Sequence, residues 1–448
     1  MAADTRQTPT RERILADYER PAMTVVTHQV RTRLRRIAVV AATPLLVLAI
    51  GMNTAPAVGG GVDIGVTRSG TGDVSALDAA LNRISAQNPD QGIQVALLRW
   101  GRLVWSAQRG MTMLNQHPPK MVDAATMFNY ASFGKLVLGA FGLRQVEKGL
   151  LDLDLPIAAY IGTTIAGAQA VTSRMLLSHT SGYGDVYSSP KVQPLLPAPP
   201  DQMPTPGTTM NYDPNTPFTF QQLSAGIDPP VEPGASYAYQ DTNFLLLYHV
   251  LAQRLGGVEA MQSQLGAFLA EAGSAHAEDA TQITEDRDSP YTLDHYAHGY
   301  QMLSNNRGLQ DYNTAYGAKG IPTDAMGDPF GDAAFAGTAL GAAQLVDALF
   351  VRGVLLKDAT VQAMTTPTPQ STGAGDPYGL ATKVAMVASQ VWNGHSGNYA
   401  GFTSAVYSER HDGLTLAVLT NRANTANSAD DIWSALVPVA ERLDPSSL

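Results

Sequence analysis

The stretch FNYASFGKLVLGAFGLRQVEKG, residues 128–149, is predicted to form one apolar helix with a serine and a lysine in its first turn. In its first half, apolar residues cover nearly every face, which is typical of a helix buried at the centre of a domain. Ser132 and Lys135 are three positions apart, so their side chains share one face of the helix and can touch. Polar residues return in the second half, and Gly149 is a typical end signal.

The pairing of Ser132 with Lys135 has a chemical use. A serine hydroxyl is a poor nucleophile until a base removes its proton. At the buried amino end of a helix, desolvation and the helix dipole both disfavour the ammonium form of lysine, so Lys135 could be that base. The same helix end can direct N–H groups at a developing oxyanion. Alone, Ser-x-x-Lys is a weak signal, because Ser188-Ser-Pro-Lys191 in a Pro-containing segment also matches it.

Composition excludes several classes of protein. The chain has 448 residues and no cysteine, which excludes disulfides, thiolate metal sites and thiol nucleophiles. Of its 29 basic and 39 acidic residues, 8 and 4 fall in residues 1–57, so the remainder has a net charge of −14. A nucleic-acid partner is therefore not expected.

The amino end resembles a targeting signal. Arg35 and Arg36 precede the apolar run IAVVAATPLLVLAIGM, and Ala55-Pro-Ala57 offers a small-x-small cleavage pattern. The run is shorter than the roughly 20 residues of a stable membrane span. We expect residues 1–57 to be an export signal, which makes the mature protein secreted or associated with the cell envelope. An uncleaved signal acting as an anchor is the alternative, and would be its one contact with a membrane.

The order of the remaining segments predicts the fold class. After a Gly-rich linker, residues 58–73, IQVALLRW and RLVWSAQ flank Gly101 as a β-hairpin would. Helical patterns follow at 171–182 and 241–257, and residues 190–233 between them are dense in proline, as in a surface excursion or a lid.

Beyond residue 378, the chain alternates like antiparallel strands and closes with a helix at 429–443. We predict an α/β (α+β) protein in which residues 74–165 and 330–448 form an antiparallel sheet flanked by helices. Residues 166–329 would be an inserted, mainly helical lobe.

Two segments carry a resemblance to a known family. SFGKLVLGAFGLRQVEKGLLDLDLPIAAYI, which begins at Ser132, and VTSRMLLSHTSGYGD, which begins at Val171, resemble the serine β-lactamase and penicillin-recognising family. The likeness is closest to its class C β-lactamase, DD-carboxypeptidase and esterase branch. In that branch a Ser-x-x-Lys helix is followed by Leu-Leu-x-His-Thr-Ser-Gly, then by Tyr-x-Asn, then by (Lys/His)-x-Gly.

The two later motifs are also present in the expected order. YAYQDTNFLLLYHVLAQ supplies Tyr239-Gln-Asp241, and NGHSGNYAGFTSAVY supplies His395-Ser-Gly397. Order, spacing and flanking sequence agree over residues 75–425. The resemblance implies a β-lactamase/transpeptidase-like fold and a hydrolase that needs no metal and no cofactor.

The resemblance implies a role for each motif residue. Ser132 would be the acylated nucleophile and Lys135 its base or proton relay. Tyr239 would pass the proton to the leaving group. His395 would hold the proton network of the pocket, where other branches use lysine. Taken singly, each of these side chains has an ordinary structural explanation.

Four further positions would shape the substrate site. The backbone N–H groups of Ser132 and Asn398 would form the oxyanion hole, and Gly397 would let substrate approach the strand edge because it has no Cβ. Lys383 would lie on the strand beside His395 and hold a terminal carboxylate with help from the Ser396 hydroxyl, as DD-carboxypeptidases of this branch do. A solvent-facing strand lysine is the alternative for Lys383.

Asp241 departs from the family pattern, which has asparagine there. The asparagine amide can accept from lysine and donate to substrate, whereas an ionised aspartate only accepts. Its negative charge would favour the ammonium form of Lys135, against a role as base. Either Asp241 turns away from the lysine, or the two share a proton, or Tyr239 takes over the base role.

Other interpretations remain at this point. Gly394-His-Ser396-Gly-Asn398 nearly matches the Gly-x-Ser-x-Gly elbow of α/β-hydrolases, with His411 as the base downstream. His295 and His298 could be a helical metal pair, but no third ligand is evident. The leading prediction is a serine hydrolase of D-alanyl-D-alanine carboxypeptidase type that acts on a small molecule or peptide. A β-lactamase, an esterase and a catalytically weak penicillin-binding or peptidoglycan-sensing protein are the alternatives.

Overall fold

The structure is a computed structural model, and it describes residues 74–443 apart from 116, 197–211, 274–280, 283–289, 303–307, 315–320, 322–334, 388, 400 and 424–425. The described residues belong to one compact unit. The predicted export signal, the linker and the middle of the Pro-rich segment lie outside the described residues. No helix in the described part is both long enough and apolar enough to span a bilayer.

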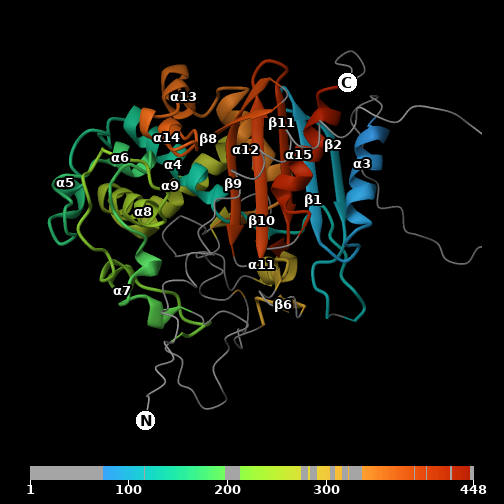
Figure 1. Ribbon diagram of the computed structural model, residues 1–448, viewed down its shortest axis with the longest axis horizontal. Coiled ribbons are helices and arrows are strands. Elements are labelled where there is room, and N and C mark those ends of the chain that lie inside the picture. The colour runs from blue at the N-terminus through green and yellow to red at the C-terminus, as the bar shows by residue number, and fades with distance from the viewer. Residues whose placement is uncertain are drawn as a thin grey trace, which may run out of the picture. The chain divides into compact units, whose positions relative to one another are not determined.

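A six-stranded antiparallel sheet is the framework of the molecule, with strand order β2-β1-β11-β10-β9-β8. The predicted hairpin is confirmed: β1 and β2 meet at Trp100 and Gly101, which both have positive φ. Strand β1 then pairs along its whole length with β11, so the two ends of the described chain share one sheet (Figure 1). The strands are β1 (Ile93–Arg99), β2 (Arg102–Arg109), β8 (Lys383–Val387), β9 (Gln390–Tyr399), β10 (Phe402–Glu409) and β11 (Leu414–Thr420).

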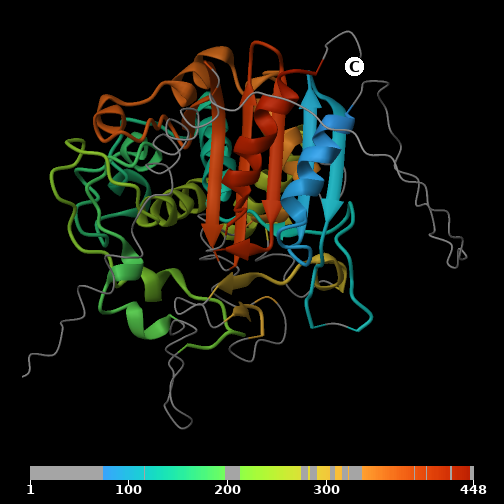
Figure 2. The ribbon, with the colours of Figure 1, turned by 45° about the vertical axis from the view of Figure 1, so that its right-hand side comes forward.

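Helices cover both faces of this sheet. On one face, α3 (Ser75–Ser85) and α15 (Ala429–Ala440) lie side by side, as Figure 2 shows, and bury a core that includes Trp392 and Trp433. On the other face, α12 (Ala339–Phe350) and α4 (Phe133–Glu147) pack against the strands. The larger core lies on this second face.

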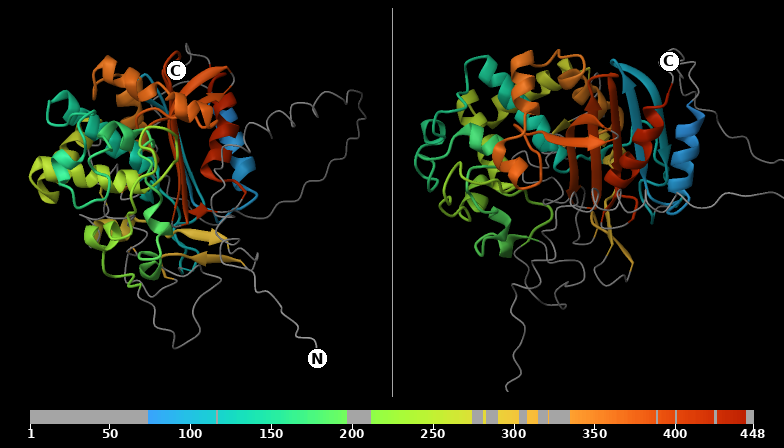
Figure 3. Two further views of the ribbon diagram at one scale, coloured as in Figure 1. Left: turned by 60° about the vertical axis from the view of Figure 1, so that its left-hand side comes forward. Right: turned by 45° about the horizontal axis from the view of Figure 1, so that its top comes forward.

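The remaining helices gather mainly beyond the β8–β9 edge of the sheet (Figure 3). Helix α8 packs on α4, α5, α6 and α9. Helix α4 thus lies between α8 and the strands β9 and β10, which explains why nearly all of its side chains are buried. These elements are α5 (Ala158–Ile161), α6 (Ser173–Leu177), η1 (Val186–Ser188), η2 (Gln193–Leu195), α7 (Phe220–Ser224), α8 (Thr242–Leu255), α9 (Val258–Glu271), α13 (Asp358–Thr365) and α14 (Pro369–Gly373). The fold class predicted from the sequence is confirmed, while the domain boundaries stay a prediction.

The prediction that one helix spans residues 128–149 was wrong at its amino end. Phe128 and Asn129 form the short strand β3, and α4 begins only at Phe133. The reason is a tight turn: Ala131 has φ of 48°, and its N–H donates to the Asn129 side chain. Ser132 is therefore the N-cap of the helix, placed on a turn that projects it toward the strands.

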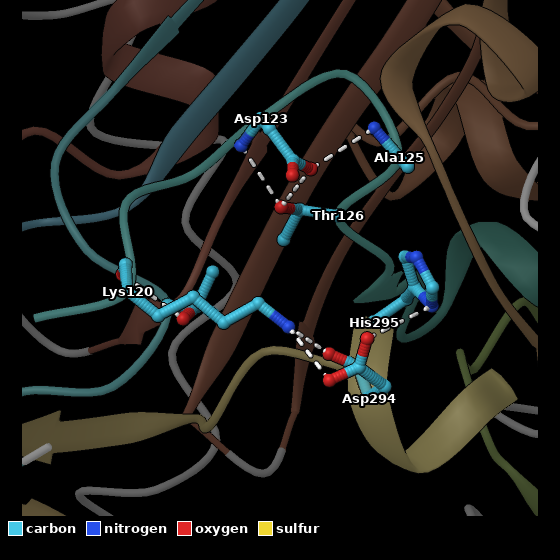
Figure 4. Close-up of polar contacts among 7 residues, drawn as sticks. Lys120, Asp123, Ala125, Thr126, Asp294 and His295 are labelled. Atoms are coloured by element: carbon cyan, nitrogen blue, oxygen red, sulfur yellow. Dashed lines mark hydrogen bonds and ion pairs between the residues drawn. The ribbon is translucent and has the colours of Figure 1, made fainter. Parts of the chain in front are cut away.

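Contacts on both sides hold this turn in place. Strand β3 pairs with β7 (Phe335–Gly337), which also pairs with β4 (Thr281–Gln282). Just before β3, the Met127 N–H donates to the carbonyl of His295, 2.8 Å away, at the end of α11 (Pro290–His295). Figure 4 shows the polar contacts beside it, where Lys120 binds Asp294 and Thr126 donates to Asp123. A third small sheet contains β12 (Arg422–Ala423), β5 (Tyr300–Met302) and β6 (Leu309–Asp311).

Candidate active site

Ser132 and Lys135 meet at the start of α4, as their spacing predicts. The Lys135 Nζ lies 3.1 Å from the Ser132 Oγ. Lys135 is fully buried, whereas Ser132 keeps part of its surface exposed. A buried ammonium is costly unless it is paired. The arrangement therefore places a reachable hydroxyl next to a buried amino group.

Asp241 is the ionic partner of Lys135. Its Oδ1 lies 2.7 Å from the Lys135 Nζ, so the alternative in which Asp241 turns away from the lysine was wrong. Asp241 stands at the amino end of α8, yet its side chain caps no backbone N–H of that helix. The Asp241 side chain is 32% exposed, compared with 1% for Lys135. One carboxylate therefore faces both the buried lysine and the solvent side of the site.

Tyr239 lies beside this pair with its hydroxyl buried. The Lys135 Nζ is 5.2 Å from the centroid of the Tyr239 ring. Burial raises the pKa of Tyr239 to about 12, although the positive charge of Lys135 acts in the opposite direction. The hydroxyl is thus protonated at neutral pH. It interacts with the side chains of Ser132 and Lys135, so it lies next to the reacting hydroxyl.

The strand β9 forms the wall opposite Ser132. A Cβ added to Gly397 would lie 2.7 Å from the Ser132 nitrogen and 2.7 Å from the Tyr130 carbonyl. A side chain at Gly397 would therefore collide with the turn that carries Ser132, and the close approach of substrate expected there stays a prediction. Asn398 is exposed near the end of the strand, and its part in an oxyanion hole stays a prediction.

His395 is fully buried in the same strand, and its hydrogen bonds fix its tautomer. Its Nδ1 lies 2.6 Å from the carbonyl oxygen of Ser396, which can only accept, so Nδ1 carries the proton. Its Nε2 then accepts from the Tyr378 hydroxyl, 3.1 Å away. Burial lowers the pKa of His395 well below its usual range, and the positive charge of Lys383 acts in the same direction. His395 is therefore a neutral, fixed side chain.

Lys383 lies where the sequence analysis placed it. It opens β8, pairs with Gly394 of β9, and its Nζ is 3.2 Å from the Ser396 Oγ. The same Nζ is 5.7 Å from the centroid of the Tyr239 ring. Lys383 is partly exposed, so an anion can reach a site made of its ammonium and the Ser396 hydroxyl.

Three residues of the site were missed by the sequence analysis. Tyr378 holds His395, and Tyr237 packs against Tyr378 while donating to Asp376 over 2.7 Å. His179 packs against Tyr239, with the two ring centroids 4.3 Å apart. No spacing in the sequence indicates Tyr378 or Tyr237, because neither belongs to the three motifs.

The competing interpretations do not fit this geometry. The segment Gly394–Asn398 lies within β9 and pairs along its length with β10, so it is not the strand–turn–helix that a nucleophile elbow requires. His411 lies in an exposed hairpin turn. His298 pairs with Asp311, and the described residues contain no group of three or more metal-binding side chains.

A model of the beta-lactamase family matches residues 77–441. The chain belongs to the beta-lactamase family. This confirms the resemblance seen in the motifs. With Ser132 and Lys135 in contact at the start of α4, this member of the family is a serine hydrolase.

Solved structures show the same fold. The D-stereospecific amidohydrolase from Streptomyces sp. has a TM-score of 0.62 at 22% identity, over 81% of this chain and 98% of that one. The D-amino acid amidase from Ochrobactrum anthropi SV3, solved with L-phenylalanine amide, has a TM-score of 0.64 at 18% identity, over 82% and 98%. The octameric penicillin-binding protein homologue from Pyrococcus abyssi has a TM-score of 0.60 at 17% identity, over 82% and 78%.

Proposed function

We propose that the protein hydrolyses an amide bond on the carbonyl side of a D-amino acid, through an acyl-enzyme on Ser132. The observation that carries this proposal is the 3.1 Å contact between the Ser132 Oγ and the Lys135 Nζ, with the Gly397 edge of β9 directly opposite. Two of the similar solved structures are amide hydrolases of D-stereospecific or D-amino acid type, which supports the choice of bond and of substrate class.

The reaction balances with the side chains present. Ser132 Oγ attacks the amide carbon as its proton passes to Lys135, which requires the neutral amine. Tyr239 donates its proton to the leaving nitrogen and regains one from Lys135, so the C–N bond breaks and an ester forms on Ser132. A water molecule then attacks the ester, a proton returns to the Ser132 oxygen, and the acid is released. Tyr239 is suited to the donor step because its hydroxyl is protonated and interacts with the side chains of Ser132 and Lys135.

The finer proposal is a D-alanyl-D-alanine carboxypeptidase-like activity. It is supported by Lys383 and Ser396, whose Nζ and Oγ lie 3.2 Å apart at the strand edge. A carboxylate accepting from both would hold the leaving D-amino acid in place. The substrate would then be a D-amino-acid peptide with a free terminal carboxylate.

The test is acylation and turnover by the Ser132→Ala variant. We expect the wild type to form a covalent adduct with penicillin and to release D-alanine from D-alanyl-D-alanine, and the variant to do neither. Intact-protein mass spectrometry measures the adduct, and a D-alanine assay measures release. A variant that still gains the penicillin mass would overturn the assignment of Ser132. The same spectra give the mass of the exported form, because we also propose that residues 1–57 are removed on export.

Three other functions stay as alternatives. A β-lactamase or an esterase would use the same nucleophile, and rapid turnover of a chromogenic cephalosporin or of p-nitrophenyl butyrate would favour one of these. The Lys135–Asp241 ion pair favours a third candidate, a weak penicillin-binding or peptidoglycan-sensing protein, because it stabilises the ammonium that cannot act as base. A penicillin adduct that persists for hours without D-alanine release would identify that candidate.

A further inference from the structure

Asp241 gives the site a negative charge on the side where substrate enters. It stands where the family pattern has an asparagine that can donate to substrate, and an ionised carboxylate cannot donate. Lys135 engages Oδ1 at 2.7 Å, and no described side chain donates to Oδ2. Since the side chain is 32% exposed, a ligand bound beside Ser132 can reach the Asp241 carboxylate.

We propose that Asp241 selects substrates whose acylated residue has a free α-ammonium group, which its carboxylate binds through Oδ2. This inference rests on the proposed amide hydrolysis and names the substrate class within it: unacylated D-amino acid amides and short D-peptides. The α-ammonium of such a substrate is two bonds from the carbonyl that Ser132 attacks. It therefore lies on the same side of the site as the Ser132–Lys135–Asp241 group.

The charges around the cleft favour this placement. Asp376, a second carboxylate near the site, already accepts a hydrogen bond from Tyr237, which packs against Tyr378. Lys383 lies on the strand edge and repels a cation there. A substrate with an ammonium at Asp241 and a carboxylate at Lys383 would thus be aligned by both ends across Ser132. N-acylation removes the positive charge and leaves a single N–H at the α-nitrogen, so the contact with the Asp241 carboxylate is weaker, and the acyl carbonyl oxygen adds an acceptor that the carboxylate cannot bind.

Substrate binding at Asp241 also bears on Lys135. A carboxylate shared between two cations stabilises each of them less than it stabilises one alone. An ammonium at Oδ2 therefore favours the neutral amine of Lys135, the form that accepts the proton of Ser132. Substrates with a free α-ammonium therefore weaken the hold of Asp241 on the ammonium form of Lys135, which would otherwise keep Lys135 from acting as base.

The experiment compares kcat/KM for D-alanine p-nitroanilide and N-acetyl-D-alanine p-nitroanilide. We expect wild type to prefer the free amine by about 10- to 100-fold, the range of one hydrogen bond to a charged group. In Asp241→Asn the ratio should fall to near unity or reverse, because the amide regains a donor for the acetyl carbonyl. Use of the ratio cancels any loss of acylation rate shared by both substrates.

The matched control is Asp376→Asn, which removes one negative charge near the site and should leave the ratio unchanged. Equal wild-type rates for the two anilides would overturn the inference while leaving the amide hydrolase in place. A ratio unchanged by Asp241→Asn would also overturn it. Failure to hydrolyse either anilide, with no penicillin adduct on Ser132, would instead overturn the proposed function itself.

Discussion

Two lysines in this site lie in different surroundings and are suited to different tasks. Lys135, at the start of α4, is fully buried and held between a serine hydroxyl and a carboxylate. Lys383, at the start of β8, is partly exposed, and its neighbour at 3.2 Å is a neutral hydroxyl. Both have their Nζ within 6 Å of the Tyr239 ring centroid, at 5.2 Å and 5.7 Å.

The difference shows how burial assigns chemistry to a side chain. Loss of solvation penalises the charged form of Lys135. Once its ion pair with Asp241 is weakened, the neutral amine is favoured, and that form can accept a proton. Lys383 keeps contact with water and remains a point charge that can attract an anion. The predictions below test whether the two lysines can be separated experimentally into a base and a carboxylate receptor.

The largest effect is expected for Lys135→Gln. Loss of the base should lower kcat/KM by about 100- to 10,000-fold for amide substrates with or without a carboxylate. Steady-state hydrolysis of D-alanyl-D-alanine and of D-phenylalanine amide measures this. Lys148→Gln, at the exposed carboxyl end of the same helix, is the control and should retain full activity. A Lys135→Gln enzyme within tenfold of wild type would show that the base lies elsewhere.

A smaller and more selective effect is expected for Lys383→Ala. The KM for D-alanyl-D-alanine should rise by about 10- to 100-fold, because a charge-assisted contact with the carboxylate is lost. The KM for D-phenylalanine amide, which has no carboxylate, should not change. If both substrates lose activity equally, Lys383 supports the site electrostatically, and the distinction drawn between the two lysines fails.

The smallest effect is expected for Tyr378→Phe, which leaves both lysines in place. The Tyr378 hydroxyl donates to Nε2 and so stabilises neutral His395; without it the pKa of His395 should rise and the low-pH limb of activity should move to higher pH. Near pH 7, kcat should fall by about three- to tenfold. Nitrogen NMR of the His395 ring measures the change directly.

Tyr183→Phe supplies the matched control for this last change. Its buried hydroxyl donates to the Ala166 carbonyl over 2.8 Å, outside the site, so its loss should leave the His395 signals and the pH profile unchanged. Identical His395 spectra in wild type and Tyr378→Phe would remove Tyr378 from the account of the site.

Much of the site followed from the sequence because its parts obey local rules. Ser132 and Lys135 touch because positions three apart on a helix share a face. Lys383 contacts Ser396 because neighbouring antiparallel strands bring positions 383 and 394 opposite each other. The β-hairpin at Gly101 followed from the apolar runs on either side of a turn residue. In each case the geometry is set within one element or one pair of strands.

The remainder depends on tertiary packing that no local pattern records. The turn at Ala131, which ends β3 before α4 can begin, depends on pairing with β7 some 200 residues later. Tyr378 reaches His395 only because the segment before β8 folds back beneath β9. The orientation of Asp241 was left open among three arrangements, and its 2.7 Å contact with Lys135 removes one of them.

Helix α4 passes the segment before β8 with no room for a methyl group: a Cβ on Gly139 would lie 2.1 Å from that of Ala381. Ala381 is two residues before Lys383, so this close crossing helps to fix the distance between the Ser132 end of α4 and Lys383 at the start of β8. If Ser132 and Lys383 act as proposed, this fixed distance limits the length of the leaving group. A larger residue at position 139, combined with glycine at position 381, would move α4 relative to β8 and is a starting point for accepting a longer leaving group.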